Sequence, residues 1–94
     1  MRKIEKQMID AVKAKTTWHG SNTSVSIHVD ARGFLIPNIF LHSNHIASVE
    51  NDVVCVNEYT LKQWPTPTTK SRLRALGVNV TTKAGVTYLD GKAF

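Results

Sequence analysis

The stretch Trp64–Leu76, WPTPTTKSRLRAL, decides the fold because local signals for starting and stopping a helix lie within it and directly after it. Thr66 can accept a hydrogen bond from a free backbone N–H of the first helical turn. Pro67 follows at the first helical position, where its fixed φ fits and its missing N–H is not needed. Gly77 suits the left-handed conformation that ends many helices. The sequence therefore predicts a short helix over Pro67–Leu76.

Upstream of this helix, short apolar stretches are separated by turn residues. In Ser24–Val29 every second residue is apolar, which is typical of a strand with one buried face. Three more strands are expected over Phe34–His42, His45–Glu50 and Val53–Val56. Pro37 requires an edge position, a bulge or a break in the second strand. The pattern predicts a four-stranded antiparallel meander whose last strand, an unbroken apolar run, is buried on both faces.

The remaining segments complete an α+β domain. Arg2–Lys15 has apolar residues at helical spacing, so it predicts an amphipathic N-terminal helix. After the central helix, where Leu73 faces the core, Val78–Thr81 and Val86–Leu89 predict a C-terminal β-hairpin. We therefore expect a single domain over residues 1–94: N-terminal helix, four-stranded antiparallel meander, short basic helix and C-terminal hairpin. The helices should cover one face of the sheet.

The net charge of +5 is unevenly distributed. Residues 1–15 carry +3 and residues 62–94 carry +5, whereas residues 16–61 carry −3. Both predicted helices are thus basic and the meander is mildly acidic. This asymmetry favours an anionic partner more than uniform basicity would.

Composition also bounds the cellular setting. Cys55 is the only cysteine, so no internal disulfide can form and a reducing compartment is expected. Because Cys55 lies in an apolar run, we expect it to be a small buried hydrophobe. No segment approaches the roughly 20 apolar residues that a membrane helix needs. We therefore expect a soluble intracellular protein without a membrane partner, and the oligomeric state stays open.

The first turns of the central helix carry the candidate site. Free N–H groups and the positive end of the helix dipole favour phosphate, and the Thr68 and Thr69 hydroxyls and the Lys70 ammonium would add to them. Lys70 and Arg74 share a face, and Arg72 points elsewhere. These five residues are the predicted nucleic-acid-binding residues, through the phosphate backbone. The alternative interpretation is ordinary capping and a solvated face.

Little in the sequence supports a metal site or a catalytic site. His42 and His45 flank a turn, but a structural zinc site requires four ligands, so no metal or other cofactor is expected. Asp30, Asp52 and Asp90 occupy predicted turns, which explains them locally. No strained nucleophile motif or Gly-rich phosphate loop is present. An enzyme is therefore not expected.

Three runs resemble a group of small accessory proteins of tailed bacteriophages: LHSNHIA (Leu41–Ala47), the Trp64–Leu76 stretch, and YLDG (Tyr88–Gly91). The resemblance implies expression in the cytoplasm of an infected bacterium and implies no mechanism.

Two hypotheses follow for the function. The first is a non-enzymatic binder of nucleic acid through the basic helices, which a continuous positive surface joining both helices would favour. The second is a phage protein that binds and inhibits or redirects a host protein. An exposed edge strand and an apolar patch with Tyr59 or Trp64 would favour the second.

Overall fold

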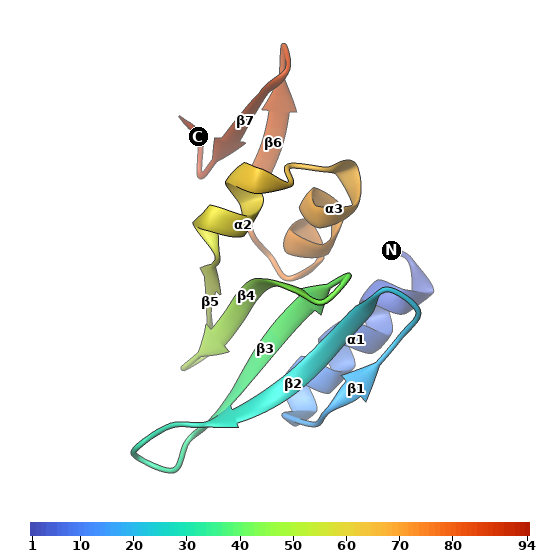
Figure 1. Cartoon of the computed structure of the whole chain (residues 1–94), viewed down its shortest axis with the longest axis vertical. Helices are drawn as coiled ribbons and strands as arrows, with labels where there is room; N and C mark the ends of the chain where they lie inside the picture. The colour runs from blue at the N-terminus through green and yellow to red at the C-terminus, as the bar shows by residue number, and fades with distance from the viewer.

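The structure, a computed structural model, describes residues 1–94. In chain order the elements are α1 (Lys3–Ala14), β1 (Trp18–His19), β2 (Thr23–Val29), β3 (Leu35–Leu41), β4 (Asn44–Glu50), β5 (Val53–Val56), α2 (Glu58–Gln63), α3 (Pro67–Ala75), β6 (Val80–Lys83), β7 (Val86–Leu89) and β8 (Lys92–Ala93). The predicted α+β class is confirmed, with a main sheet at one end of the molecule and a smaller sheet at the other (Figure 1).

The main sheet is an antiparallel meander of five strands, in the order β1-β2-β3-β4-β5. The sequence predicted four, because the segment before β2 looked like a polar connection. In the structure Trp18 pairs with Val25, so a two-residue edge strand forms there. The central register places Val25 opposite Ile39 and Ile39 opposite Ala47, which gathers apolar side chains on one face.

At Pro37 the pairing of strand β3 with its two neighbours changes. It pairs with Ile27 of β2, but the pairing of β3 with β4 begins only at Asn38, opposite Ser48. Proline has no N–H to donate to a second neighbouring strand. Strand β3 therefore has a neighbour only on the β2 side at Pro37, in agreement with the predicted edge-type position. A bulge between Ile39 and Phe40 interrupts the β3–β4 register nearby.

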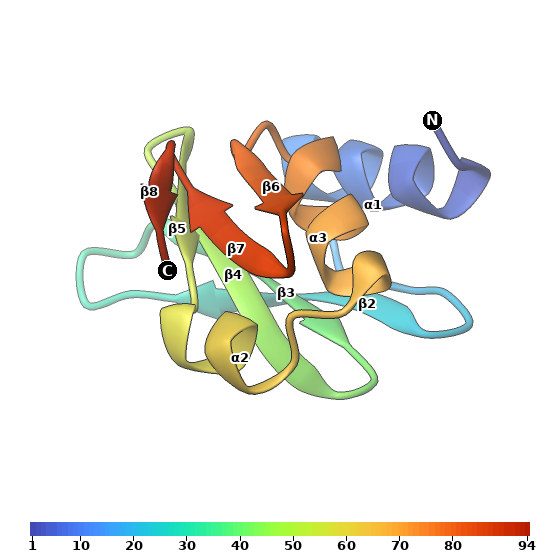
Figure 2. The same ribbon diagram turned by 90° about the horizontal axis from the view of Figure 1, so that it is seen from above.

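Helices α1 and α3 lie on the same face of the main sheet (Figure 2). Met8 from α1 and Leu73 from α3 are fully buried against Val25, Ile39 and Ala47, in a core cluster of 10 residues. This confirms that Leu73 faces the core. In Figure 1 α1 lies behind the sheet, so the opposite face points toward the viewer.

Local chemistry sets the ends of α3 as the sequence predicts. The Thr66 hydroxyl accepts a hydrogen bond of 3.2 Å from the Thr69 N–H, and Pro67 is the first helical residue. Gly77 follows with φ of +95°, a left-handed conformation that glycine adopts without strain. The helix itself ends at Ala75, one residue before the predicted limit.

Helix α2 is absent from the sequence prediction. Its first turn is capped by Asn57, whose Oδ1 accepts a 3.1 Å hydrogen bond from the Thr60 N–H. Leu61 anchors the helix in the core at 1% exposure. Six residues are too few for a periodic apolar pattern, so the cap was the only signal.

Strand β5 corrects the expectation of a strand buried on both faces. It is the last strand of the sheet, with Val53 61% exposed and Val54 and Val56 half-buried. Cys55 is exposed as well, so it is not the buried hydrophobe that the sequence indicated. An edge strand lacks a neighbour on one side, and here no helix covers the face that carries Cys55. An apolar run alone therefore does not establish burial.

The C-terminal hairpin is confirmed and gains a third strand. Strands β6, β7 and β8 form a separate antiparallel sheet that packs beside α3. It lies beyond the helices at the top of the molecule in Figure 1.

Candidate functional site

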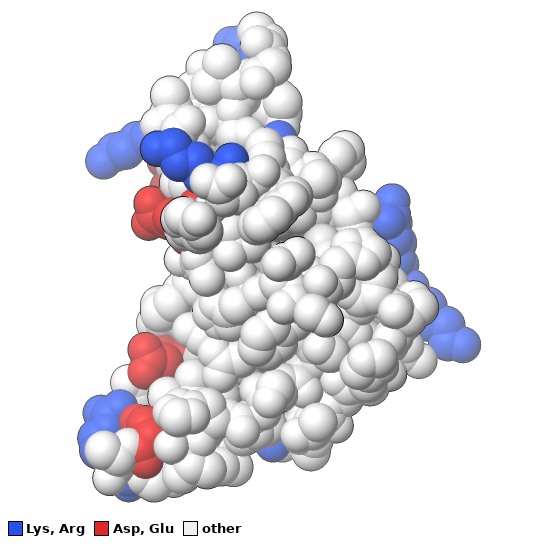
Figure 3. All heavy atoms as spheres, in the orientation of Figure 1, with Lys and Arg blue, Asp and Glu red and all other residues white.

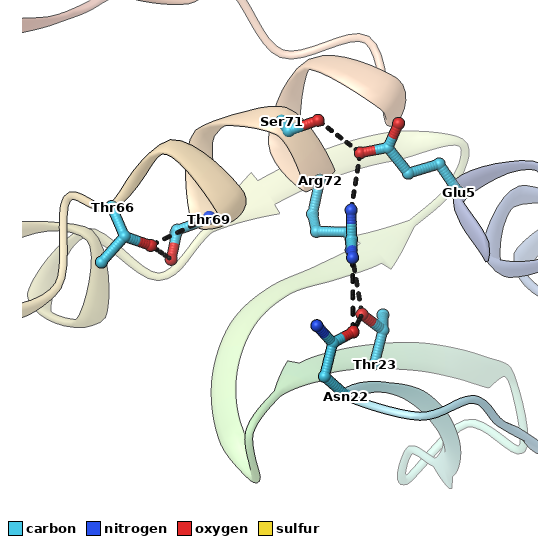
Figure 4. Close-up of polar contacts among 7 residues, drawn as sticks. All are labelled: Glu5, Asn22, Thr23, Thr66, Thr69, Ser71 and Arg72. Carbon is cyan, nitrogen blue, oxygen red and sulfur yellow. Dashed lines mark hydrogen bonds and ion pairs between the residues drawn. The ribbon is translucent and has the colours of Figure 1, made fainter. Parts of the chain in front are cut away.

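Arg72, one of the predicted nucleic-acid ligands, lies inside the protein. Its guanidinium is 2.8 Å from Glu5 Oε2, and it also donates to the Thr23 hydroxyl at 2.9 Å and to Asn22 Oδ1 at 3.3 Å (Figure 4). The residue is 2% exposed. Arg72 therefore ties α3 to α1 and to the start of β2, and it is not available to a phosphate backbone.

Glu5 completes this buried cluster. It accepts hydrogen bonds from the Ser71 hydroxyl and from Arg72 (Figure 4). Burial by itself raises the pKa of the Glu5 carboxyl, but the hydrogen bonds from Ser71 and Arg72 outweigh it and hold the pKa below its ordinary value of 4.5. A buried ion pair stabilises a fold only when its remaining polar atoms are satisfied, and here they are.

Lys70 and Arg74 share a face of α3, as predicted, but that face is directed at β6. The Lys70 ammonium donates to the Thr82 hydroxyl, and the residue is buried. Arg74 Nη1 donates to the Val80 carbonyl at 3.1 Å. Both cations therefore bind the smaller sheet, through the face of α3 that was predicted to contact a phosphate backbone.

The first turn of α3 is likewise occupied by its own residues. Thr69 is buried, with its N–H and its hydroxyl both bonded to the Thr66 hydroxyl (Figure 4). Thr68 is half-buried. The structure thus buries three of the five predicted residues, Thr69, Lys70 and Arg72, and leaves Arg74 exposed with one bond to the Val80 carbonyl. Nucleic-acid contact through α3 stays a prediction that these contacts oppose.

The remaining basic residues do not form one continuous surface in the view of Figure 3. There the Lys and Arg side chains occur in separate groups at the margins, and the broad centre of this face carries no charged residue. On α1, Lys3 and Lys6 are exposed near the start and Lys13 near the end. The basic character of α1 is therefore retained, whereas most of that of α3 is not.

A hollow of about 640 Å³ lies on the helix-covered side of the main sheet, where α1 and α3 end. We call it the groove. Its floor is apolar and comes from three strands: Leu35 and Pro37 of β3, Val49 of β4 and Val54 of β5. One wall is α1, and the C-terminal end of α3 closes one end; these contribute Ile9, Val12, Ala75, Leu76 and Gly77.

Two features of the sequence lie at this part of the sheet. Pro37 cannot extend the ladder between β3 and β4, so the two strands have no pairing beyond Asn38 and Ser48. Helix α3 ends at Ala75, at the limit of the groove. Beyond the fully buried Pro37, Phe34 is 55% exposed and Leu35 43% exposed.

The rim of the groove carries opposite charges on opposite sides. Lys13 and Lys15 belong to the α1 side, and Glu50 and Asp52 belong to the hairpin between β4 and β5. That hairpin turns through Asn51 and Asp52, both with positive φ, as a tight two-residue connection requires. The rim therefore offers a basic side and an acidic side.

A third charged pair on the rim is neutralised internally. Arg32 forms a 2.8 Å ion pair with Asp30 and lies 4.8 Å above the centre of the Phe34 ring. Hydrogen bonds from the Arg32 side chain hold the pKa of Asp30 below its ordinary value of 3.8. The turn between β2 and β3 thus presents the Phe34 ring at the rim without a free charge.

His45 forms a separate polar cluster. Its Nε2 is 2.9 Å from Asn38 Oδ1, and its Nδ1 is 2.9 Å from Asn57 Nδ2. Because an amide nitrogen only donates, Nδ1 accepts and Nε2 carries the proton. Burial lowers the pKa of His45 below 6.5, which favours the neutral ring. His42, which was considered with it as a metal ligand, is exposed at φ of +50°, and no group of three His, Cys, Asp or Glu side chains is positioned to hold a metal ion.

The sequence analysis missed the groove, because a groove depends on where helices stop over a sheet. Pro37 was its only local signal. No helix of the structure is long and apolar enough to cross a membrane.

Comparisons with known proteins test the resemblance to phage proteins. A family model described as Kyanoviridae Gp96 protein matches residues 1–94. No curated protein and no solved structure matches the chain. The predicted resemblance to small phage proteins is confirmed, because the chain belongs to the Kyanoviridae Gp96 protein family.

Proposed function

We propose that this phage protein is a non-enzymatic accessory protein that acts in the host cytoplasm by binding another protein, with the groove as the contact surface. The observation that carries the proposal is the apolar floor of the groove, which continues the core face of the sheet to the surface. Protein interfaces commonly combine an apolar centre with a charged rim, and the groove has both.

The energetics favour an occupant. Fully burying a large apolar side chain contributes roughly 1.5–3 kcal/mol, and Phe34 and Leu35 are each about half exposed at the groove. Because each is only about half exposed, covering the two of them contributes roughly 1.5–3 kcal/mol, up to about a third of the roughly 8 kcal/mol of a micromolar complex.

Other exposed features support a protein partner over nucleic acid. Strand β5 is an edge strand with Val53 exposed, and Tyr59 is 72% and Trp64 49% exposed. The nucleic-acid hypothesis required the basic side chains of α3 on an open surface, but two of them, Lys70 and Arg72, are buried. That hypothesis remains the second candidate, supported by the exposed cations of α1 such as Lys3 and Lys6.

The test uses two variants that add the same charge to opposite faces of the sheet. Leu35→Asp changes the floor of the groove, and Ser26→Asp changes an exposed position on the face away from the helices. Proteins captured from host lysate are identified, purified and titrated against each variant. We expect a direct partner whose affinity falls at least tenfold with Leu35→Asp and is unchanged with Ser26→Asp.

The same preparations are titrated with DNA and RNA by fluorescence polarisation. Nucleic-acid binding that Lys3→Glu with Lys6→Glu abolishes and Leu35→Asp leaves intact would establish the second candidate instead. Equal binding of a partner protein by both aspartate variants would contradict the role of the groove. Thermal unfolding of each variant checks that the fold is retained.

A further inference from the structure

We infer that the groove receives an amphipathic α-helix of the partner, with acidic residues along one flank and basic residues along the other. The inference rests on the proposed function and specifies the chemistry of the partner. It is drawn from the shape of the groove and from the distribution of charge on its rim.

The shape of the groove corresponds to a missing helix. Main-sheet residues that face α1 and α3 near their middle, such as Val25 and Ile39, are fully buried. The same face continues to Leu35, which is 43% exposed, and to Val54, which is half-buried, and both residues line the groove. In two-layer α+β domains an apolar sheet face is covered by helices. A helix placed beside α1 would cover this floor and would contact Ile9.

An extended segment fits the groove less well. An added strand binds through backbone groups along the edge of a sheet. The floor of the groove consists of side chains that project from a sheet face, which matches the apolar stripe of a helix with anchors at i, i+3 or i+4 and i+7. A hollow of about 640 Å³ has room for several such side chains.

The rim determines which helix is accepted. Lys13 and Lys15 face one flank of an occupant, and Glu50 and Asp52 face the other. A uniformly acidic helix would meet like charges at the hairpin, and a uniformly basic helix would meet them at α1. A helix with opposite charges on its two flanks makes favourable pairs on both sides.

The split rim also fixes direction. Turning a helix end for end exchanges its flanks relative to the groove. A helix with one acidic and one basic flank therefore has one favourable direction, with its acidic flank beside Lys13 and Lys15. Its reversed placement brings like charges together on both sides.

The test uses three synthetic peptides with the same leucine stripe and length and with different flanks: glutamate opposite lysine, glutamate on both, and lysine on both. Binding to the full chain is measured calorimetrically at 0.15 M salt, where long-range attraction to the net charge is largely screened. We expect the split peptide to bind about tenfold more tightly than either uniform peptide. Leu35→Asp should weaken all three.

A charge reversal on α1 sharpens the test. Lys13→Glu with Lys15→Glu makes both sides of the rim acidic, so the preference should move to the all-lysine peptide. The matched control is Lys3→Glu with Lys6→Glu, which changes the net charge equally on the same helix away from the groove. This control should keep the preference for the split peptide.

Three outcomes would contradict the helical occupant, the selectivity of the rim or the groove itself. If no peptide binds while a captured protein is still lost with Leu35→Asp, the proposed function stands and the helical occupant is wrong. If both charge-reversal pairs shift the preference equally, the rim does not select the partner and the inference is overturned. If peptide binding is indifferent to Leu35→Asp, the groove is not the site.

Discussion

The two ends of one sheet face differ in what covers them. At the end near Thr23 and Leu41, which we call the covered end, α1 and α3 pack on the strands and every polar group of the Glu5–Arg72 cluster is satisfied. At the end near Leu35, which we call the open end, the strands continue beyond the helices and apolar side chains meet solvent. The same sheet face is apolar at both ends, from Val25 and Ile39 to Leu35. The length and placement of the helices therefore decide which apolar residues become core and which become a binding surface.

The largest effect is expected at the covered end from Arg72→Leu. Removing the cation leaves the Glu5 carboxylate buried without its partner, which typically costs about 3–5 kcal/mol. The double variant Glu5→Leu with Arg72→Leu should recover much of the loss, because no charge is then buried. Urea unfolding measures both, and a loss under about 1 kcal/mol for the single variant would show that the pair is not essential.

The same substitution at the two ends should give different results. Leu73→Ala at the covered end creates a cavity and should destabilise by roughly 2–4 kcal/mol. Leu35→Ala at the open end should change the free energy of unfolding by less than about 1 kcal/mol, since the side chain is already partly solvated. Comparable losses in chemical denaturation would break the distinction between the ends.

The cap of α3 makes a smaller contribution. Thr66→Ala removes the acceptor for the Thr69 N–H and should destabilise by about 1 kcal/mol, whereas Thr66→Asp should be tolerated. Thermal unfolding of the three proteins compares them. Equal midpoints would mean that the Thr66–Thr69 bond does not stabilise the helix.

The smallest expected effect is a dependence of the free energy of unfolding on pH, caused by protonation of His45. Because its pKa is lower in the folded protein than 6.5, the unfolded chain binds the proton more readily. The free energy of unfolding should therefore decrease as the pH falls below 6.5 and level off once folded His45 is also protonated. His45→Gln should remove this dependence; an unchanged slope would assign it to another group.

Hydrogen exchange locates the same effect on the molecule. Protonated Nδ1 cannot accept from Asn57, which caps α2 through its Oδ1. Mild acid should thus accelerate exchange in the first turn of α2 and leave β2 at the open end unchanged. Uniform acceleration would contradict this assignment.

Sequence reasoning succeeded where a few neighbouring residues decide the structure. Thr66, Pro67 and Gly77 act within one helical turn, and their conformations in the structure are the predicted ones. The burial of Leu73 follows from helical spacing in the same way. The four predicted strands are present in the structure, and they could be predicted because alternation and turn residues are also local signals.

The failures concern relations between distant residues. Glu5 and Arg72 are 67 positions apart, so no pattern showed that the arginine would be buried. Strand β5 has the composition of a central strand, but Cys55 is exposed because the sheet ends there. The groove arises from where α3 stops and where Pro37 interrupts pairing, and only their combination in space defines it.

The separation of Glu5 and Arg72 also has a consequence for the order in which a nascent chain can fold. The ribosome releases α1 first, and its apolar stripe is ready to dock once the meander has formed. Docking at that stage would bury the Glu5 carboxylate before Arg72 has left the ribosome. We expect α1 to remain loosely attached in a released fragment that ends at Gln63 and to become protected from protease only in chains that include α3. The first helix to be made would thus be among the last to settle.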